Sequence, residues 1–219
     1  MDDTAADHPP ARDTQWQPWS PLEAADALTR SQARWWVSGG SAIDLLLDRP
    51  SERDDLDLST TAADLGPLCD ALPHGISAWA DLDGQLAPLG EAPGDADLQR
   101  VLLHDDQRGV WVAELHVEDG APKAWLYRRD PRLQLPWAEA VVDHGGIPVG
   151  ALQVQLLWKA LRPSPQDDAD RADALPLLDE TQRAWLGTAL LRIHPHSSWA
   201  IHTRSPFAPA KASWNRGRR

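Results

Sequence analysis

The chain has 219 residues, 42% of them hydrophobic and 25% charged, which allows one sizeable core with a helical annex. The formal net charge of -12 disfavours broad nucleic-acid binding and suits a small cationic ligand, unless it only keeps the protein soluble. The single cysteine, Cys69, excludes an internal disulfide, and no apolar run approaches the ~20 residues that span a bilayer.

Composition divides the chain into four parts. Residues 1–15, rich in Asp, Pro and Ala, are expected to be disordered and show no signal-peptide core, which predicts a cytoplasmic protein. Residues 16–150 mix helix and strand signals, and residues 151–204 become helical, so we expect an α+β core followed by a helical C-terminal subdomain. Residues 205–219 are expected to form a flexible basic tail.

The predicted elements follow in chain order. A capping box at Ser20 predicts a helix over residues 21–34, and Asp179 is the expected N-cap of the last helix. Residues 84–94, rich in Pro and Gly, are expected to be the least ordered internal stretch. Strands are predicted over residues 35–37, 55–60, 76–80, 111–117 and 124–128, and the other helices over residues 42–47, 61–72, 151–161, 167–178 and 180–193.

Two adjacent glycines, Gly39 and Gly40, fall between the first strand and the helix that follows it. They allow a sharp turn and let the backbone approach a ligand closely. The start of the helix then offers N–H groups to an anion, and Ser41 adds a hydroxyl donor. Because such turns are common, the glycines alone are weak evidence for a phosphate site.

Asp55 and Asp57 follow on a predicted strand, where residues two apart point to the same face. Two carboxylates side by side are costly in a core, and divalent cations relieve that cost. Two bound metals ~4 Å apart are typical of phosphoryl chemistry. The alternative is a solvated edge strand with two exposed aspartates.

A third acid, Glu114, lies between small or apolar neighbours on a later predicted strand. Placed beside the two aspartates, it would take a proton from an attacking hydroxyl and complete the metal site. Glu118 competes for this role but falls at the turn predicted over residues 118–120. His116 shares a face with Glu114 and would line the substrate side, unless it is only a partly exposed strand residue.

The order and spacing of these elements resemble the nucleotidyltransferase superfamily. Its pattern is a hydrophobic residue, Gly, Gly or Ser, a spacer, then Asp-hydrophobic-Asp and a later carboxylate, found here at residues 37–41, 55–58 and 114. Residues 35–44 and 54–58 look more closely like bacterial aminoglycoside nucleotidyltransferase-like (aminoglycoside adenylyltransferase-like) proteins. With later segments included, the resemblance covers residues 21–199.

The resemblance implies a nucleotidyltransferase fold, with a mixed β-sheet flanked by helices and residues 16–150 as the catalytic core. It also implies an enzyme that binds two Mg²⁺ ions and transfers AMP from ATP to a hydroxyl of a small acceptor, with an aminoglycoside-like cation as the first guess. By similarity, Asp55, Asp57 and Glu114 hold the metals, Glu114 is the base, and phosphate is held by Gly39, Gly40, Ser41 and Lys159. Lys159 is otherwise a surface lysine on an apolar helix.

The chain departs from these relatives at three places. Relatives often carry Trp where this chain has Ser41, although Ser is the residue of the wider superfamily. Many have His where this chain has Arg53, and a Lys-Asp pair where it has Gln166 and Asp167. Two other classes stay open: an antitoxin or protein-modifying partner of a toxin, and a non-catalytic nucleotide-binding module. No Gly-x-x-x-x-Gly-Lys-Ser/Thr loop is present, which argues against a P-loop NTPase.

Overall fold

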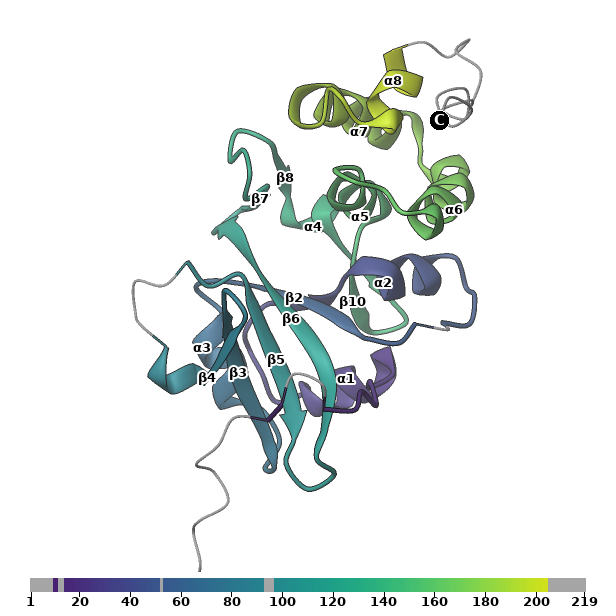
Figure 1. The fold of residues 1–219 in the computed structure, drawn as a ribbon. Coiled ribbons are helices and arrows are strands. Elements are labelled where there is room, and N and C mark those ends of the chain that lie inside the picture. The colour runs from purple at the N-terminus through teal and green to yellow at the C-terminus, as the bar shows by residue number, and fades with distance from the viewer. Residues whose placement is uncertain (1–9, 12–13, 52, 93–96, 205–219) are drawn as a thin grey trace, which may run out of the picture. The chain divides into compact units, whose positions relative to one another are not determined.

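The computed structural model describes residues 10–11, 14–51, 53–92 and 97–204 (Figure 1). The predictions for residues 1–9 and 205–219 lie outside the described residues. The chain divides into two compact units, Met1–Gly150 and Ala151–Arg219. Within the described residues, no helix is long and apolar enough to cross a membrane.

The described part of the first unit contains one mixed sheet of ten strands. Its main path runs β4-β3-β5-β6-β2-β1-β10-β9, and β7 and β8 continue from β6. The β2–β6 and β1–β10 pairs are parallel, whereas the other strand pairs are antiparallel. The strands are β1 Trp35–Val37, β2 Asp57–Thr61, β3 Ile76–Leu82, β4 Gln85–Pro88, β5 Arg100–Asp105, β6 Val110–Ala121, β7 Ala124–Leu126, β8 Gln134–Pro136, β9 Val141–His144 and β10 Ile147–Gly150.

Five short helices accompany this sheet: α1 Pro21–Ala27, α2 Gly39–Leu46, α3 Leu65–Asp70, the 3₁₀ helix η1 Leu89–Glu91 and α4 Trp137–Ala140. The predicted capping box is present, since the Ser20 hydroxyl accepts a hydrogen bond from the Glu23 backbone N–H at 3.2 Å. The helix nevertheless ends at Ala27 and not at residue 34, and beyond it the Ser31 hydroxyl accepts a hydrogen bond from the Ala33 N–H in a local turn.

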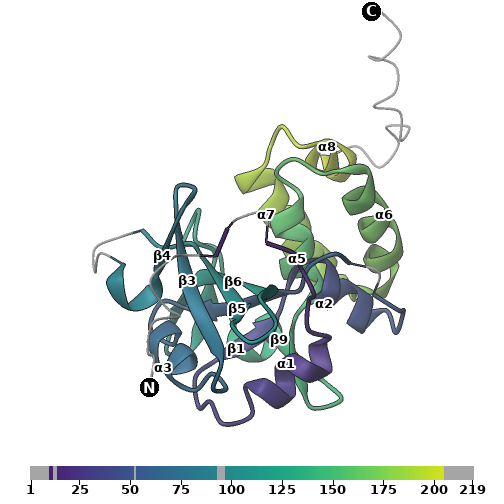
Figure 2. The ribbon, with the colours of Figure 1, turned by 60° about the horizontal axis from the view of Figure 1, so that its bottom comes forward.

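One face of the sheet is buried by apolar side chains from several elements. Val37, Leu58 and Leu115 alternate into this core, together with Leu28 beside α1 and Leu68 of α3. In Figure 2 both helices lie on the lower side of the sheet. Cys69, expected to be a small buried residue, is partly buried against this core, and burial raises the pKa of its thiol to about 12.

Two tight hairpins of the first unit differ from the sequence-based predictions. The stretch 84–94 is predicted to be the least ordered internal part of the chain, yet its residues 85–88 form β4, which pairs with β3 across a turn at Asp83 and Gly84, whose φ angles are 50° and 96°. Residues 93 and 94 lie outside the described residues. An Asp-Gly pair with positive φ is typical of a two-residue hairpin turn. A similar turn at Gly145 and Gly146 joins β9 to β10, two strands that the sequence analysis missed.

Strand β6 is longer than predicted and continues to Ala121. The turn predicted over residues 118–120 is therefore wrong, and Glu118 is a buried strand residue. Its carboxylate accepts a hydrogen bond from Trp125 Nε1 at 2.5 Å, which gives the buried carboxylate a hydrogen-bond partner. Strand β7 follows after two residues and pairs back onto β6.

The described part of the second unit is helical: α5 Leu152–Lys159, α6 Pro165–Ala174, the 3₁₀ helix η2 Leu175–Leu177, α7 Glu180–Ile193 and α8 Ser198–Arg204. The bounds of α7 and its N-cap Asp179 are as predicted, with the Asp179 side chain accepting a hydrogen bond from the Gln182 N–H at 2.8 Å. The predicted class, α+β with a mixed sheet and a helical C-terminal part, is thus confirmed.

Candidate active site

The diglycine turn lies directly against Asp57. Gly39 has a φ of +61°, and a Cβ atom added to it would overlap Oδ2 of Asp57 and lie 2.7 Å from its Cγ. The Ser38 N–H also donates a hydrogen bond to the Asp57 carbonyl oxygen at 2.9 Å. Because both the backbone angle and the space exclude a side chain, glycine at position 39 brings the turn onto the carboxylate.

Asp57 and Glu114 are neighbours across the parallel strands β2 and β6, where their Cα atoms are in register. Neighbouring residues in register point to the same face, so both carboxylates lie on the side of the sheet opposite the Leu58 and Leu115 core. His116, two residues further along β6, shares this side. The register of β2 with β6 therefore explains why Asp57, one of the two predicted aspartates, lies beside Glu114.

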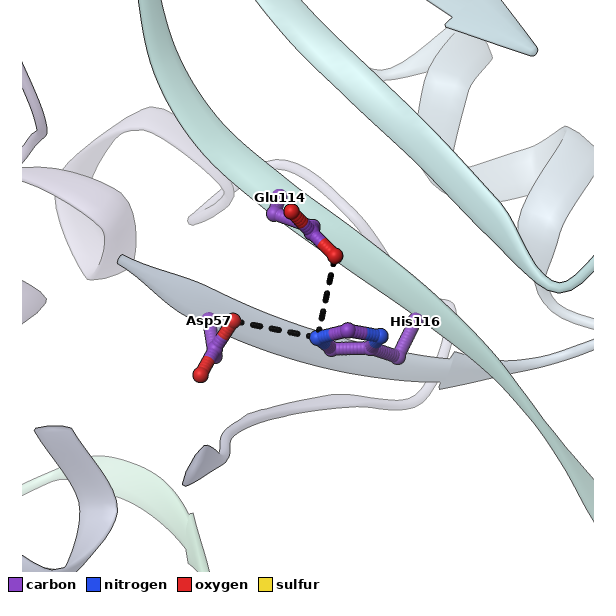
Figure 3. Close-up of side chains that lie close together, drawn as sticks. All are labelled: Asp57, Glu114 and His116. Carbon is purple, nitrogen blue, oxygen red and sulfur yellow. Dashed lines mark hydrogen bonds and ion pairs between the residues drawn. The ribbon is translucent and has the colours of Figure 1, made fainter. Parts of the chain in front are cut away.

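Figure 3 shows the Asp57 and Glu114 carboxylates on two sides of the His116 ring. His116 Nε2 lies 3.0 Å from Asp57 Oδ1 and 3.5 Å from Glu114 Oε1. One ligand atom from each residue lies within 4.8 Å of the others, a spacing that one metal ion can bridge. Hard carboxylate oxygens fit Mg²⁺, which also takes ligands from substrate phosphates.

Asp55 lies outside this group of three. It precedes β2 in a bend and is more exposed than Asp57, because strand pairing starts only at Leu56, whose carbonyl accepts the Glu114 N–H at 2.9 Å. Desolvation and then the negative charges of Asp57 and Asp54 raise the pKa of Asp55. The charge of Asp57 thus acts on the Asp55 carboxylate, but the prediction that Asp55 shares a strand with Asp57 is wrong, because β2 begins at Asp57.

Arg100 supports Glu114 from the adjacent strand β5. Its Nη2 lies 2.9 Å from Glu114 Oε2, and its Nε lies 3.7 Å from Asp81 Oδ2. Burial raises the pKa of Glu114 more than the charges of His116 and Arg100 lower it. Arg100 was not predicted as a site residue because strand β5 was not predicted, although the apolar residues 101–103 after Arg100 indicate a strand.

His116 lies beside both carboxylates of the cluster. Burial lowers its pKa, but the hydrogen bond to Asp57 and the charges of Asp57 and Glu114 outweigh burial, so the pKa of His116 is raised. The two carboxylates thus favour a proton on the imidazole. The side chain of His116 is 40% exposed, which agrees both with a partly exposed strand residue and with a position on the substrate side.

The predicted phosphate-binding residues fall into two groups. Gly39, Gly40 and Ser41 form the first turn of α2, where Ser41 is only 4% exposed. Lys159 ends α5 in the second unit, where its Nζ lies 2.5 Å from Asp167 and 3.2 Å from Asp170. The turn residues thus lie together beside Asp57, whereas Lys159 is part of an ion-pair cluster within the helical unit.

Known proteins resemble the chain at low identity. The crystal structure of ANT(2'')-Ia in complex with adenylyl-2''-tobramycin is 19% identical, with a TM-score of 0.47, over 79% of this chain and 94% of that chain. The solution structure of the antibiotic-resistance factor ANT(2'')-Ia is 18% identical, with a TM-score of 0.44, over 79% and 89%. No curated protein matches the chain.

The family model of aminoglycoside-2''-adenylyltransferase matches residues 22–82. This segment holds the diglycine turn, α2 and β2 with Asp57, whereas Glu114 and His116 lie beyond it. The mixed sheet and helical C-terminal part agree with the nucleotidyltransferase fold that the sequence resemblance implies. Over residues 22–82 the chain is similar to the aminoglycoside-2''-adenylyltransferase family, in agreement with the resemblance seen in the sequence.

Proposed function

We propose that the protein is a Mg²⁺-dependent nucleotidyltransferase that moves AMP from ATP to a hydroxyl group of a small acceptor. The observation that supports this most strongly is the close contact between the diglycine turn and the Asp57 carboxylate. Asp57 is also in register with Glu114 on the neighbouring strand. A turn that admits phosphate next to paired carboxylates is the arrangement that nucleotidyl transfer needs.

Each part of the site has a role in this reaction. The N–H groups at the start of α2 receive the negatively charged phosphates of ATP. Asp57, Glu114 and the nearby Asp55 would hold Mg²⁺, which when bound neutralises phosphate charge and polarises the reacting phosphorus. The acceptor oxygen forms a bond to the α-phosphorus while the bond to the bridging oxygen breaks, so AMP is transferred and pyrophosphate leaves.

Glu114 is our candidate for the base that takes the proton from the acceptor hydroxyl. Arg100 binds Oε2 of its carboxylate, while Oε1 faces His116 and the cluster. The side chain of Glu114 is only 12% exposed, and its raised pKa makes it a better proton acceptor than an ordinary glutamate. The proton therefore moves to Oε1 in this proposal.

We infer an aminoglycoside-like cation as the first acceptor class to test. The matched family model describes an aminoglycoside-2''-adenylyltransferase, and the net charge of -12 favours a cationic ligand. We also propose Lys159 as the cation that neutralises the leaving phosphates. In this role the Lys159 ammonium would release the carboxylates of Asp167 and Asp170 and bind phosphate oxygens.

The proposal is tested by incubating the full chain with ATP, Mg²⁺ and a panel of aminoglycosides. Mass spectrometry should show an acceptor heavier by one AMP group, and an enzyme-coupled assay should show pyrophosphate release. The same reaction with a chelator in place of Mg²⁺ is the control and should give neither product. If no acceptor is modified and no pyrophosphate appears, nucleotidyl transfer is the wrong function.

A further inference from the structure

Arg53, on the segment before β2, binds to Asp44 of α2. The Nε of Arg53 donates a hydrogen bond to Asp44 Oδ2 at 2.8 Å, and the Nη2 of Arg53 donates to Asp44 Oδ1 at 3.0 Å. This fork fixes the plane of the guanidinium. Asp44 is 2% exposed and follows Gly40 by four residues, so both lie on one face of α2.

The guanidinium of Arg53 lies flat against Gly40. A Cβ atom added to Gly40 would lie 2.7 Å from Arg53 Cζ, 2.7 Å from Nη1 and 2.8 Å from Nε. Three nearly equal distances to atoms of one plane mean that the face of the guanidinium covers the glycine Cα. The side chain of Arg53 is only 17% exposed, so this positive charge is largely enclosed beside the diglycine turn.

Arg49 binds the same carboxylate as Arg53 and can be compared with it. It also binds Asp44, with Nε donating to Oδ1 at 2.6 Å. The three atoms nearest to the missing Cβ of Gly40, however, all belong to Arg53. Two arginines therefore neutralise the same buried carboxylate, and one of them covers the backbone of the turn.

A second feature of the turn points to an anionic ligand. Ser38 is the N-cap residue of α2 and is 4% exposed, but its hydroxyl does not cap the helix and has no hydrogen-bond partner among the described residues. Buried hydroxyl groups in folded proteins are nearly always hydrogen-bonded. An anion at the turn would supply the missing acceptor, one residue from Gly39.

On the basis of the proposed function, we propose that Arg53 is a binding residue for the triphosphate of ATP, held in place for that purpose by Asp44. The guanidinium lies against the turn that receives the phosphates, on the segment that leads to Asp55 and Asp57. Its charge would therefore favour nucleotides with more phosphate groups over those with fewer.

Calorimetric titration with a nonhydrolysable ATP analogue, ADP and AMP, each with Mg²⁺, tests this inference. Arg53→Gln should weaken binding of the ATP analogue by about tenfold or more, because a charge-assisted contact is lost. Binding of AMP should change by less than about twofold, because AMP lacks the outer phosphates. Arg53→Lys should recover part of the loss, since it keeps the charge without the fork.

Arg49→Gln is the matched control, because it removes the other arginine from Asp44 and should leave the affinity for the ATP analogue nearly unchanged. Equal affinities for the ATP analogue in the Arg53→Gln, Arg49→Gln and unmodified proteins would overturn the inference, and so would an equal loss for all three nucleotides in Arg53→Gln. If Arg53→Gln does not fold, the comparison of Arg53→Lys with Arg49→Lys decides in the same way. Failure of the unmodified chain to bind any nucleotide would instead reject the proposed function.

Discussion

The two sides of the candidate site are built by different physical means. On the turn side, Gly39 lies so close to Asp57 that a Cβ atom at position 39 would overlap the carboxylate. On the strand side, Glu114 is placed by the register of β6 with β2 and lies within ion-pair distance of Arg100 and His116. Substitution on the turn side should therefore disturb both folding and turnover, whereas substitution on the strand side should act mainly on turnover.

The broadest effect is expected on the turn side, where Gly39→Ala should lower both turnover and stability. The added methyl group would overlap the Asp57 carboxylate, and a φ of +61° is unfavourable for alanine. We expect turnover to fall by about 100-fold or more, because a displacement of ~1 Å in the site is enough for that loss. Unfolding in urea should show a destabilisation of about 2 kcal/mol or more.

Gly145→Ala is the matched control for Gly39→Ala. Gly145 has a φ of +64°, but nothing lies within 4 Å of an added Cβ. This substitution should cost about 1 kcal/mol of stability from backbone conformation alone and leave turnover unchanged. Similar losses in the two variants would mean that contact with Asp57 has no special role.

On the strand side, Glu114→Gln separates chemistry from binding. Removing a general base should lower kcat by about 100-fold to 10,000-fold, while the affinity for the ATP analogue should fall much less. Glu118→Gln, also on β6 and buried against Trp125, is the comparison and should keep its turnover. A normal kcat in Glu114→Gln would remove Glu114 from the mechanism.

Asp44, on the turn side, should show an effect on stability that depends on pH. Burial raises its pKa, but hydrogen bonds from Arg53 and then Arg49 outweigh burial, so the pKa of Asp44 is lowered in the folded protein. A lowered pKa gives stability that is complete above the ordinary value of ~3.9 and is lost as the pH falls through the folded value. Asp44→Asn should therefore destabilise the protein most near neutral pH, by about 3 kcal/mol.

Urea unfolding of the Asp44→Asn and unmodified proteins at a series of pH values from 7 to 3 measures this difference. The difference should begin to shrink below pH ~4, where the Asp44 carboxylate of the unfolded chain takes up a proton before that of the folded protein does. Asp48→Asn is the control, because the side chain of Asp48 is 85% exposed and contributes little to stability. A difference between Asp44→Asn and the unmodified protein that is constant with pH would exclude the ion pairs as its cause.

The turn side could be predicted from the sequence because its elements are local. The strand of residues 35–37, the glycines and the two aspartates lie within about 20 residues, and capping chemistry gave the starts of α1 and α7. The start of β2 was placed two residues early, because alternation in the sequence does not show where pairing with β6 begins.

The strand side could be predicted only in part. Glu114 was identified, but Arg100 was not, since its position beside Glu114 depends on the pairing of β5 with β6. The role of Arg53 could not be read from the sequence either, because nothing local indicates that its side chain covers Gly40. Contacts between distant segments depend on strand register and side-chain direction, which a single sequence specifies weakly.

The central claim is that the carboxylate against the diglycine turn binds nucleotide through a metal ion. Calorimetric titration of Asp57→Asn with a nonhydrolysable ATP analogue, with and without Mg²⁺, tests it most directly, because Asn keeps the shape of the side chain and removes only its charge. We predict that Mg²⁺ strengthens binding in the unmodified protein and has no effect in the variant. An affinity in the presence of Mg²⁺ that is the same in both proteins would contradict the account.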